Sequence, residues 1–228
     1  MLKSKELRAR AWNSLKGKYW LAFAAVIVAG LLMSIGASFT TLSQEIMNIV
    51  NGVDPSEMDN TAQIGALVLS GSALVISIIG AVITFFVGHP TQVGLCNYFI
   101  KNTDSKPAFK EVFAGFKVKY GRNVGALILA AIKLILWTCV FIIPGIIKSF
   151  EYAMLPYVLA DNPELSSKEA FKKTNELMKG NKWRLFKLDF SFIGWYILCG
   201  LTLGLGTFFL IPYVEAAMAE FYVEIKNK

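Results

Sequence analysis

The chain has 228 residues, of which 55% are apolar and 17% are charged, and its mean hydropathy is +0.51. Soluble domains carry about 25% charged residues and about 45–50% apolar residues. The charged residues of this chain cluster between long windows that have none. The composition excludes a disordered chain, a coiled coil, a collagen-like chain and a disulfide-rich secreted domain, and it predicts a polytopic membrane protein.

The net charge of +7 comes from basic residues that lie beside the apolar windows. This position favours anionic lipid headgroups over nucleic acid as the partner of the positive charge. The three cysteines, Cys96, Cys139 and Cys199, all lie in apolar stretches. We interpret them as small packing residues, because an odd and scattered set does not fit a disulfide framework or a zinc site.

Four apolar blocks are long enough to cross a bilayer, which requires about 20 residues in a helix. The second contains His89 and the third contains Lys133, and no other ionisable Asp, Glu, Lys, Arg or His residue occurs within the four. His89-Pro90 predicts a kink inside the second block. The blocks are Trp20–Gln44, Thr61–Ile100, Asn123–Ile147 and Phe190–Val214.

The charges of the connecting segments predict which side of the membrane each one occupies, because Lys and Arg stay on the cytoplasmic side. The segment before the first block has six basic residues and one acid, Glu6. The next connection is acidic and the one after it is basic, so the first three connections alternate as expected. The acids are Glu45, Asp54, Glu57 and Asp59, and the bases are Lys101, Lys106, Lys110, Lys117, Lys119 and Arg122.

A fourth basic segment, residues 168–187, must also face the cytoplasm, so the chain has to cross twice between Arg122 and Lys168. Pro144-Gly145 is the predicted hinge, since proline interrupts helical hydrogen bonding and glycine permits a turn. Ile211-Pro212 is the equivalent hinge near the C-terminus. The prediction is an all-α bundle of six spans in three hairpins with both termini cytoplasmic. The alternative is four crossings with re-entrant pieces.

An internal repeat relates residues 6–23 to residues 169–186 at a constant offset of 163. Both copies contain K-G-x-x-W-x-x-F, and a weaker third copy begins at Lys106. We predict one integral membrane domain, 1–228, with repeat units 1–100, 101–161 and 162–228. Each unit begins with an amphipathic cytoplasmic helix that lies at the membrane interface or packs on the end of the bundle. The expected contacts with anionic lipid are Lys16, Lys110, Lys172 and Lys179.

Ionisable groups at membrane depth are the candidate functional residues, because exposing them to lipid costs about 2.5–3.5 kcal/mol each on insertion scales. Lys148 and Glu151 are three residues apart and can pair on one helix face. Lys133 is expected to meet Glu215 or Glu220 across the bundle. The set either lines a polar cavity or pairs within the bundle for structural reasons. Its members are Lys133, Lys148, Glu151, Glu215 and Glu220.

The segment Tyr152–Tyr222 resembles a bacterial integral membrane family known as domain of unknown function 975. The resemblance rests on the ADNPELS turn at residues 160–166, the ELMKGNKW run, the FIGW segment and the IPYVEA ending. The run RARAWNSLKG at residues 8–17 fits the pattern K-x-R-A-W-x-x-L-K-G with arginine in place of its first lysine, and it extends the resemblance over nearly the whole chain. It implies a protein of the bacterial cytoplasmic membrane and implies no activity. Ser166 in the ADNPELS turn is expected to cap the following helix.

The sequence contains no motif of an enzyme, a metal site or a cofactor site, and we expect no catalytic, cofactor-binding or metal-binding residue. Two classes of function stay open. The first is a non-enzymatic scaffold, accessory or envelope-stress component that acts through lipids, a protein partner or a second copy of itself. The second is a small transporter or channel with a polar cavity at the interface between repeat units.

Overall fold

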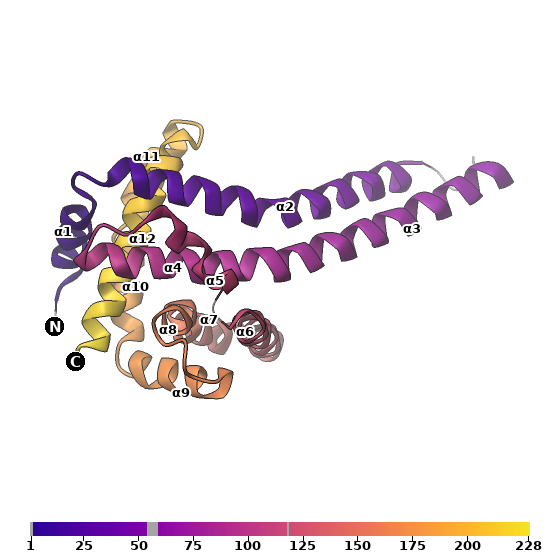
Figure 1. Ribbon diagram of the computed structural model, residues 1–228. Coiled ribbons are helices and arrows are strands. Elements are labelled where there is room, and N and C mark those ends of the chain that lie inside the picture. The colour runs from indigo at the N-terminus through magenta and orange to yellow at the C-terminus, as the bar shows by residue number, and fades with distance from the viewer. Residues whose placement is uncertain (1, 54–58, 118) are drawn as a thin grey trace. The chain divides into compact units, whose positions relative to one another are not determined.

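The computed structural model describes residues 2–53, 59–117 and 119–228, and every regular element in these ranges is a helix (Figure 1). Contacts divide the chain into two units. The larger unit comprises Met1–Ala29 and Pro90–Lys228, and the smaller unit comprises Gly30–His89. Asp54 and Glu57, which belong to the predicted acidic connection, lie outside the described residues. The division into one domain of three repeat units stays a prediction.

The smaller unit contains most of α2 (Tyr19–Asn51), α3 (Asn60–Ile83) and a π-helical turn at Thr84–Gly88. Its two helices pack closely where both carry glycine. A Cβ atom added to Gly80 would lie 2.8 Å from the carbonyl oxygen of Gly36. The Ser43 hydroxyl donates a hydrogen bond of 2.8 Å to the Ala73 carbonyl. Small residues therefore allow the two apolar helices to approach, as they do in membrane helix pairs.

The larger unit contains α1, the start of α2 and all the elements from α4 onward. A π-helical turn, rather than a simple kink, precedes His89-Pro90, where α4 begins. The elements are α1 (Ser4–Leu15), α4 (His89–Asp104), the 3-10 helix η3 (Phe109–Phe113), α5 (Ala114–Lys117), α6 (Tyr120–Val140), α7 (Ile142–Tyr152), α8 (Leu155–Asp161), α9 (Ser167–Met178), α10 (Lys182–Phe190), α11 (Ile193–Leu201) and α12 (Leu205–Lys226).

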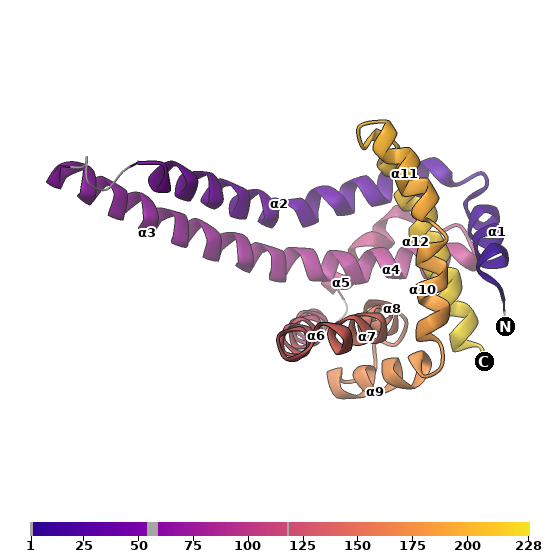
Figure 2. The ribbon, with the colours of Figure 1, turned by 180° about the vertical axis from the view of Figure 1, so that it is seen from behind.

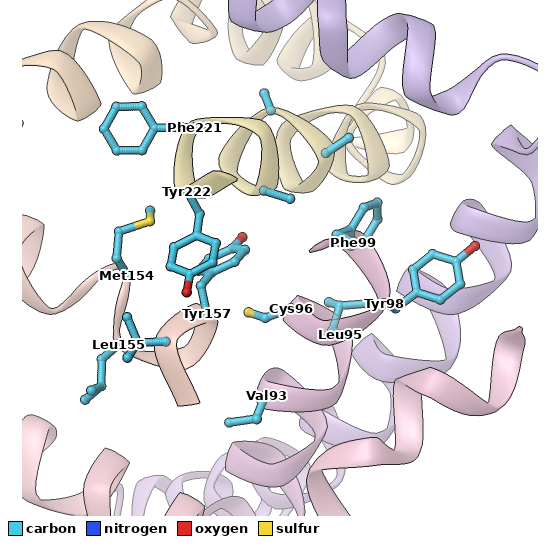
Figure 3. Packing of buried hydrophobic residues seen from close by; sticks show 14 of the residues in the cluster. Val93, Leu95, Cys96, Tyr98, Phe99, Met154, Leu155, Tyr157, Phe221 and Tyr222 are labelled. Carbon is cyan, nitrogen blue, oxygen red and sulfur yellow. The ribbon is translucent and has the colours of Figure 1, made fainter. Parts of the chain in front are cut away.

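Three helices, α4, α8 and α12, contribute the centre of the hydrophobic core of the larger unit. Figure 3 shows Cys96 of α4, Tyr157 of α8 and Tyr222 of α12 side by side. The rings of Tyr157 and Tyr222 stack with centroids 5.7 Å apart. Phe99 and Phe221 are fully buried beside them. Burial of a large apolar side chain stabilises a core by about 1.5–3 kcal/mol, so these side chains contribute strongly to the stability of the unit.

The short helix that begins each predicted repeat unit packs on the last helix of another predicted repeat unit (Figure 2). The segment η3–α5 meets α4 so closely that a Cβ atom on Gly94 would lie 1.8 Å from the Val112 carbonyl oxygen. The helix α9 packs on α7 and α8, and α1 packs on α12. These three contacts close a ring of segments that are far apart in sequence.

The helices α1 and α9 have the same bounds after the offset of 163 residues. Ser4–Leu15 becomes Ser167–Met178, and the following helices begin at Tyr19 and Lys182. Gly17 and Gly180, in the two connecting turns, have φ of +72° and +78°. The buried faces also correspond: they are Leu7, Ala11 and Leu15 in α1, and Ala170, Thr174 and Met178 in α9. This agreement is what an internal repeat predicts.

The third copy has a different local structure. Its predicted amphipathic helix is a 3-10 turn followed by the four-residue α5, and its left-handed residue is Lys119, with φ of 43°. Val112 is nevertheless fully buried, and Phe109 and Phe113 pack against the core. The apolar faces of all three copies therefore pack on the protein itself, which was one of the two predicted arrangements.

The predicted hinge at Pro144-Gly145 is displaced by three residues. The break lies at Phe141, which has extended backbone angles between α6 and α7. Pro144 is the third residue of α7, where a helix does not use the backbone N–H. Gly145 permits close packing, because a Cβ atom there would lie 2.5 Å from the Thr138 hydroxyl oxygen. Pro144 therefore lies in the first turn of α7 and does not form the turn between α6 and α7.

The predicted hinge at Ile211-Pro212 is wrong, since Pro212 lies inside the continuous helix α12. The chain turns at Leu203 and Gly204, which have φ of 53° and 85°. The block Phe190–Val214 is consequently a helical hairpin. Its first arm, α11, has nine residues and is about 14 Å long, which is too short for a hydrocarbon layer about 30 Å thick.

Among the described residues, four helices are long and apolar enough to cross a membrane, and not the six that were predicted. Two of them, Tyr120–Val140 and Ile142–Asp161, lie between the basic segments that end at Arg122 and begin at Lys168, where two crossings are predicted. The fifth and sixth spans are not confirmed, because α10 is charged and α11 is short, and the count of four agrees with the alternative prediction of four crossings. The four are Tyr19–Asn51, Asn60–Asp104, Tyr120–Val140 and Ile142–Asp161.

Replacement of Gly17 or Gly180 with alanine tests the correspondence between the two turns. Each alanine places a Cβ atom in a left-handed backbone conformation, and we expect each variant to lose about 1–2 kcal/mol of unfolding free energy. Gly125→Ala, inside α6, is the control and should be neutral or stabilising. Unfolding in detergent measures the effect. A loss at one turn without a similar loss at the other would contradict the correspondence.

Candidate functional sites

The predicted pair of Lys148 and Glu151 is present, with the ammonium nitrogen 2.6 Å from the carboxylate. Lys182, at the start of α10, forms an ion pair with the other oxygen of the same carboxylate. Glu151 is buried, and both of its oxygens are used. Lys182 could not be found by helical spacing, since the sequence separates it from Glu151 by 31 residues. The three groups join α7 to α10.

In the part of the chain that the structure describes, Lys133 forms no ion pair with Glu215 or Glu220, so that prediction is wrong. Its ammonium nitrogen lies 4.1 Å from the ring centroid of Phe171, which belongs to α9. The Phe171 ring packs edge-to-face on Tyr152, with centroids 5.5 Å apart. A cation over an aromatic face is stabilised by about 0.5–2 kcal/mol, depending on solvation, and this contact satisfies Lys133 within the protein.

Glu215 and Glu220 lie on α12, away from this cluster. Glu215 accepts a hydrogen bond of 3.2 Å from the Tyr157 hydroxyl. Glu220 is buried, and the charged groups that act on it are Arg10 and Asp104. The five predicted residues therefore occupy three separate places and do not line one cavity.

A polar cavity of about 340 Å³ lies between α4, η3–α5, α6 and α8. On one side Glu111 pairs with Lys101 at 2.7 Å and accepts a hydrogen bond of 3.0 Å from the Asn97 amide. The hydrogen bond from Lys101 lowers the pKa of Glu111, and Asn97 contributes in the same direction while burial opposes it. Asn123 and Asp161 line the cavity as well.

The other side of this cavity is the ADNPELS turn, which basic side chains hold in place. The Arg122 guanidinium donates to the carbonyls of Leu159, Asn162 and Leu165 at 2.8–2.9 Å. Asp161 accepts from the Tyr222 hydroxyl at 2.8 Å and pairs with Lys226 at 2.7 Å.

Ser166 caps α9 as predicted. The Glu169 N–H donates to its hydroxyl, and the Glu169 carboxylate accepts from the Ser166 N–H at 2.8 Å. The turn and its cap are thus part of the packed structure, and their polar groups have partners within the protein.

This cavity is a polar site at the boundary of two predicted repeat units, and none of the five predicted residues lines it. Asn97 lies in the middle of α4 and is a polar residue inside an apolar block, which is a signal that the sequence carries. Lys101, Glu111 and Asp161 lie near helix ends, where polar residues are ordinary in sequence, so composition gave no signal for them. Among the described residues, no group of three or more His, Cys, Asp or Glu side chains is arranged to hold a metal ion. The shape and polarity suit a small polar molecule.

The four lysines predicted to contact lipid are all exposed: Lys16, Lys110, Lys172 and Lys179. Trp20 and Trp183, at equivalent positions in the two matching copies, are 72% and 62% exposed. Large exposed aromatic side chains beside lysines at the start of apolar helices are typical of membrane interfaces. The contacts with lipid themselves stay a prediction.

Residues 139–228 match the family model described as protein of unknown function (DUF975). The match confirms the resemblance predicted from the ADNPELS, ELMKGNKW and IPYVEA segments, all of which lie inside it. No curated protein and no solved structure matches the chain. The match covers this C-terminal part of the chain and implies no activity, and the apolar helices are compatible with a membrane protein.

The pair of Glu111 and Lys101 predicts a pH-dependent stability. The lowered pKa of Glu111 means that the pair stabilises the fold above the ordinary carboxyl value near 4.5 and that this contribution is lost as the pH falls through the folded pKa. The unfolding midpoint of Glu111→Gln should therefore lie below that of the native chain at about pH 6, and the difference should shrink at about pH 3. A difference that stays constant with pH would contradict the ion pair.

Proposed function

We propose that this chain is a non-enzymatic, multi-pass protein of the bacterial cytoplasmic membrane that acts as a scaffold or accessory component through contacts with lipids and proteins. The observation that carries the proposal is the pairing of its membrane-depth charges within the fold. Glu151 is held by two lysines, Lys133 by an aromatic ring and Glu215 by Tyr157. Groups paired in this way stabilise the bundle and leave no row of free charges for a solute to follow.

The surface supports the same proposal. Large apolar side chains are exposed along α3, α6, α7 and α11, including Leu67, Ile135, Ile143 and Leu201. Contiguous exposed apolar surface marks contact with a membrane or with another protein. We further propose that the chain consists of three repeated units with their amphipathic helices on the cytoplasmic side, and that both termini are cytoplasmic. The matching bounds of α1 and α9 and the positions of the basic segments support this arrangement.

A transporter is the second candidate, and the polar cavity between α4 and α8 is the observation that favours it. Its volume of about 340 Å³ fits a small polar solute. Movement of such a solute would require Glu111, Asp161 and their partners to separate and pair again. The scaffold proposal requires no such change.

Two substitutions test the ion pairing of Glu151 on which the scaffold proposal rests. Glu151→Gln leaves Lys148 and Lys182 close together without a counter-charge, and we expect it to lower the unfolding free energy by about 3–5 kcal/mol, as loss of one partner from a buried ion pair does. Glu176→Gln, on the exposed side of α9, is the matched control and should change little. The midpoint of unfolding in detergent measures both.

The functional arm uses liposomes that contain the purified full chain, with dyes that report proton and potassium movement. The scaffold proposal predicts fluxes equal to those of protein-free liposomes for the native chain, for Glu215→Gln and for Asp161→Asn. A flux that the native chain supports and either variant abolishes would overturn the proposal in favour of transport.

A further inference from the structure

An apolar groove of about 560 Å³ lies between the start of α2 and the hairpin of α11 and α12. Aromatic side chains form much of its wall, and Thr202 and Gly206 lie at its far end. Several wall residues are half exposed, so the groove opens sideways. The residues that matter here are Trp12, Tyr19, Trp195, Leu198, Phe209 and Tyr213.

Specific contacts within the larger unit hold the walls of the groove in place. The Tyr19 hydroxyl donates a hydrogen bond of 2.7 Å to the Phe209 carbonyl. The Phe23 ring stacks on the Phe209 ring with centroids 5.4 Å apart, and Trp12 packs edge-to-face on Tyr213. These contacts fix the wall formed by α2 against the wall formed by α12.

Tyr19 also lines a second cavity, which is formed by Gly17, Lys18, Tyr19, Trp20, Leu21 and Lys106 and contains two lysines and no acid. The Lys18 ammonium donates to the carbonyls of Asn102 and Ser105 at 3.2 and 2.7 Å, at the C-terminal end of α4. Because an ammonium group has three donors, one stays available. Burial and the positive charge of Lys106 both lower the pKa of Lys18. A bound anion would relieve this repulsion.

The two cavities share Tyr19 as a lining residue and differ in chemistry, one cationic and one apolar. The arm α11 is about 14 Å long, close to half of a hydrocarbon layer about 30 Å thick, which is the depth of one leaflet. A molecule that fills both cavities needs an anionic head and an apolar chain about as long as one leaflet.

We propose that this site binds an anionic phospholipid of the cytoplasmic leaflet, with its phosphate between Lys18 and Lys106 and one acyl chain along the groove of α11 and α12. Trp20 lies at the level of the headgroup, and Trp195 and Leu198 contact the chain. The site rests on the proposed membrane function and adds a defined lipid position to it. It differs from the diffuse attraction predicted for Lys16, Lys110, Lys172 and Lys179.

The test measures binding of phosphatidylglycerol and phosphatidylcholine to the purified full chain in detergent, by native mass spectrometry. We expect the native chain to prefer phosphatidylglycerol, and Lys106→Gln to reduce that preference about fivefold, since one lysine near a headgroup contributes about 1 kcal/mol, which is about a fivefold change. Lys18→Gln should act in the same direction. Because Lys18 also holds the end of α4, Lys106→Gln is the more informative variant. Lys168→Gln, an exposed lysine on α9 outside this site, is the control and should keep the preference.

The apolar half of the site has its own variant. Trp195→Ala should weaken binding of both lipids, whereas Ile197→Ala, which is also exposed on α11 but does not line the groove, should weaken neither. Inorganic phosphate alone should not displace phosphatidylglycerol, because it cannot occupy the groove. Unfolding midpoints without lipid confirm that each variant is folded.

Three results would overturn this site. They are a native chain without preference for phosphatidylglycerol, a preference that Lys106→Gln keeps, or displacement by inorganic phosphate. None of them bears on the flux measurement in liposomes, so failure of the lipid site and failure of the scaffold proposal are separate outcomes.

Discussion

The larger unit depends on one packing constraint, the junction of α4, α8 and α12 around Cys96, Tyr157 and Tyr222. These helices come from three distant parts of the chain, and each supports a short helix or turn from another part. The contacts of η3–α5 with α4, of α9 with α8 and of α1 with α12 then close the ring. Charged groups around this junction, such as Glu151 and Asp161, form ion pairs within the protein. This pairing lets a largely apolar chain contain buried charged residues.

Much of this fold could be predicted from the sequence. The apolar blocks, the pairing of Lys148 with Glu151, the cap at Ser166 and the offset of 163 residues are local patterns, since each depends on spacing along one helix or on direct comparison of two segments. The need for two crossings near Lys168 followed from charge alone. Both predicted proline hinges were misplaced. Pro144 lies in the first turn of α7 and Pro212 lies within α12, because the turns form where Phe141 is extended and where Gly204 adopts a left-handed conformation.

The sites were less accessible to prediction, because their partners come from other helices. Lys182 of α10 completes the cluster around Glu151, and the ring of Phe171 of α9 contacts the ammonium group of Lys133. The polar cavity and the aromatic groove are made by segments that the sequence places far apart. Spacing within one helix identifies a charge that needs a partner, but it does not identify the partner. The predicted repeat aligns α1 with α9, but the alignment does not reveal that α1 packs on α12 and α9 on α7 and α8.

The central claim is that the short basic segments of all three units face the cytoplasm while the chain crosses the membrane an even number of times before α9. Single cysteines at Lys16, Lys110, Lys172 and Asp59, in a chain whose own cysteines are replaced with alanine, test it by labelling with a membrane-impermeant maleimide. The account predicts labelling in intact cells at Asp59→Cys and, at the three lysine positions, labelling after the membrane is opened. Labelling of Lys172→Cys in intact cells would contradict it.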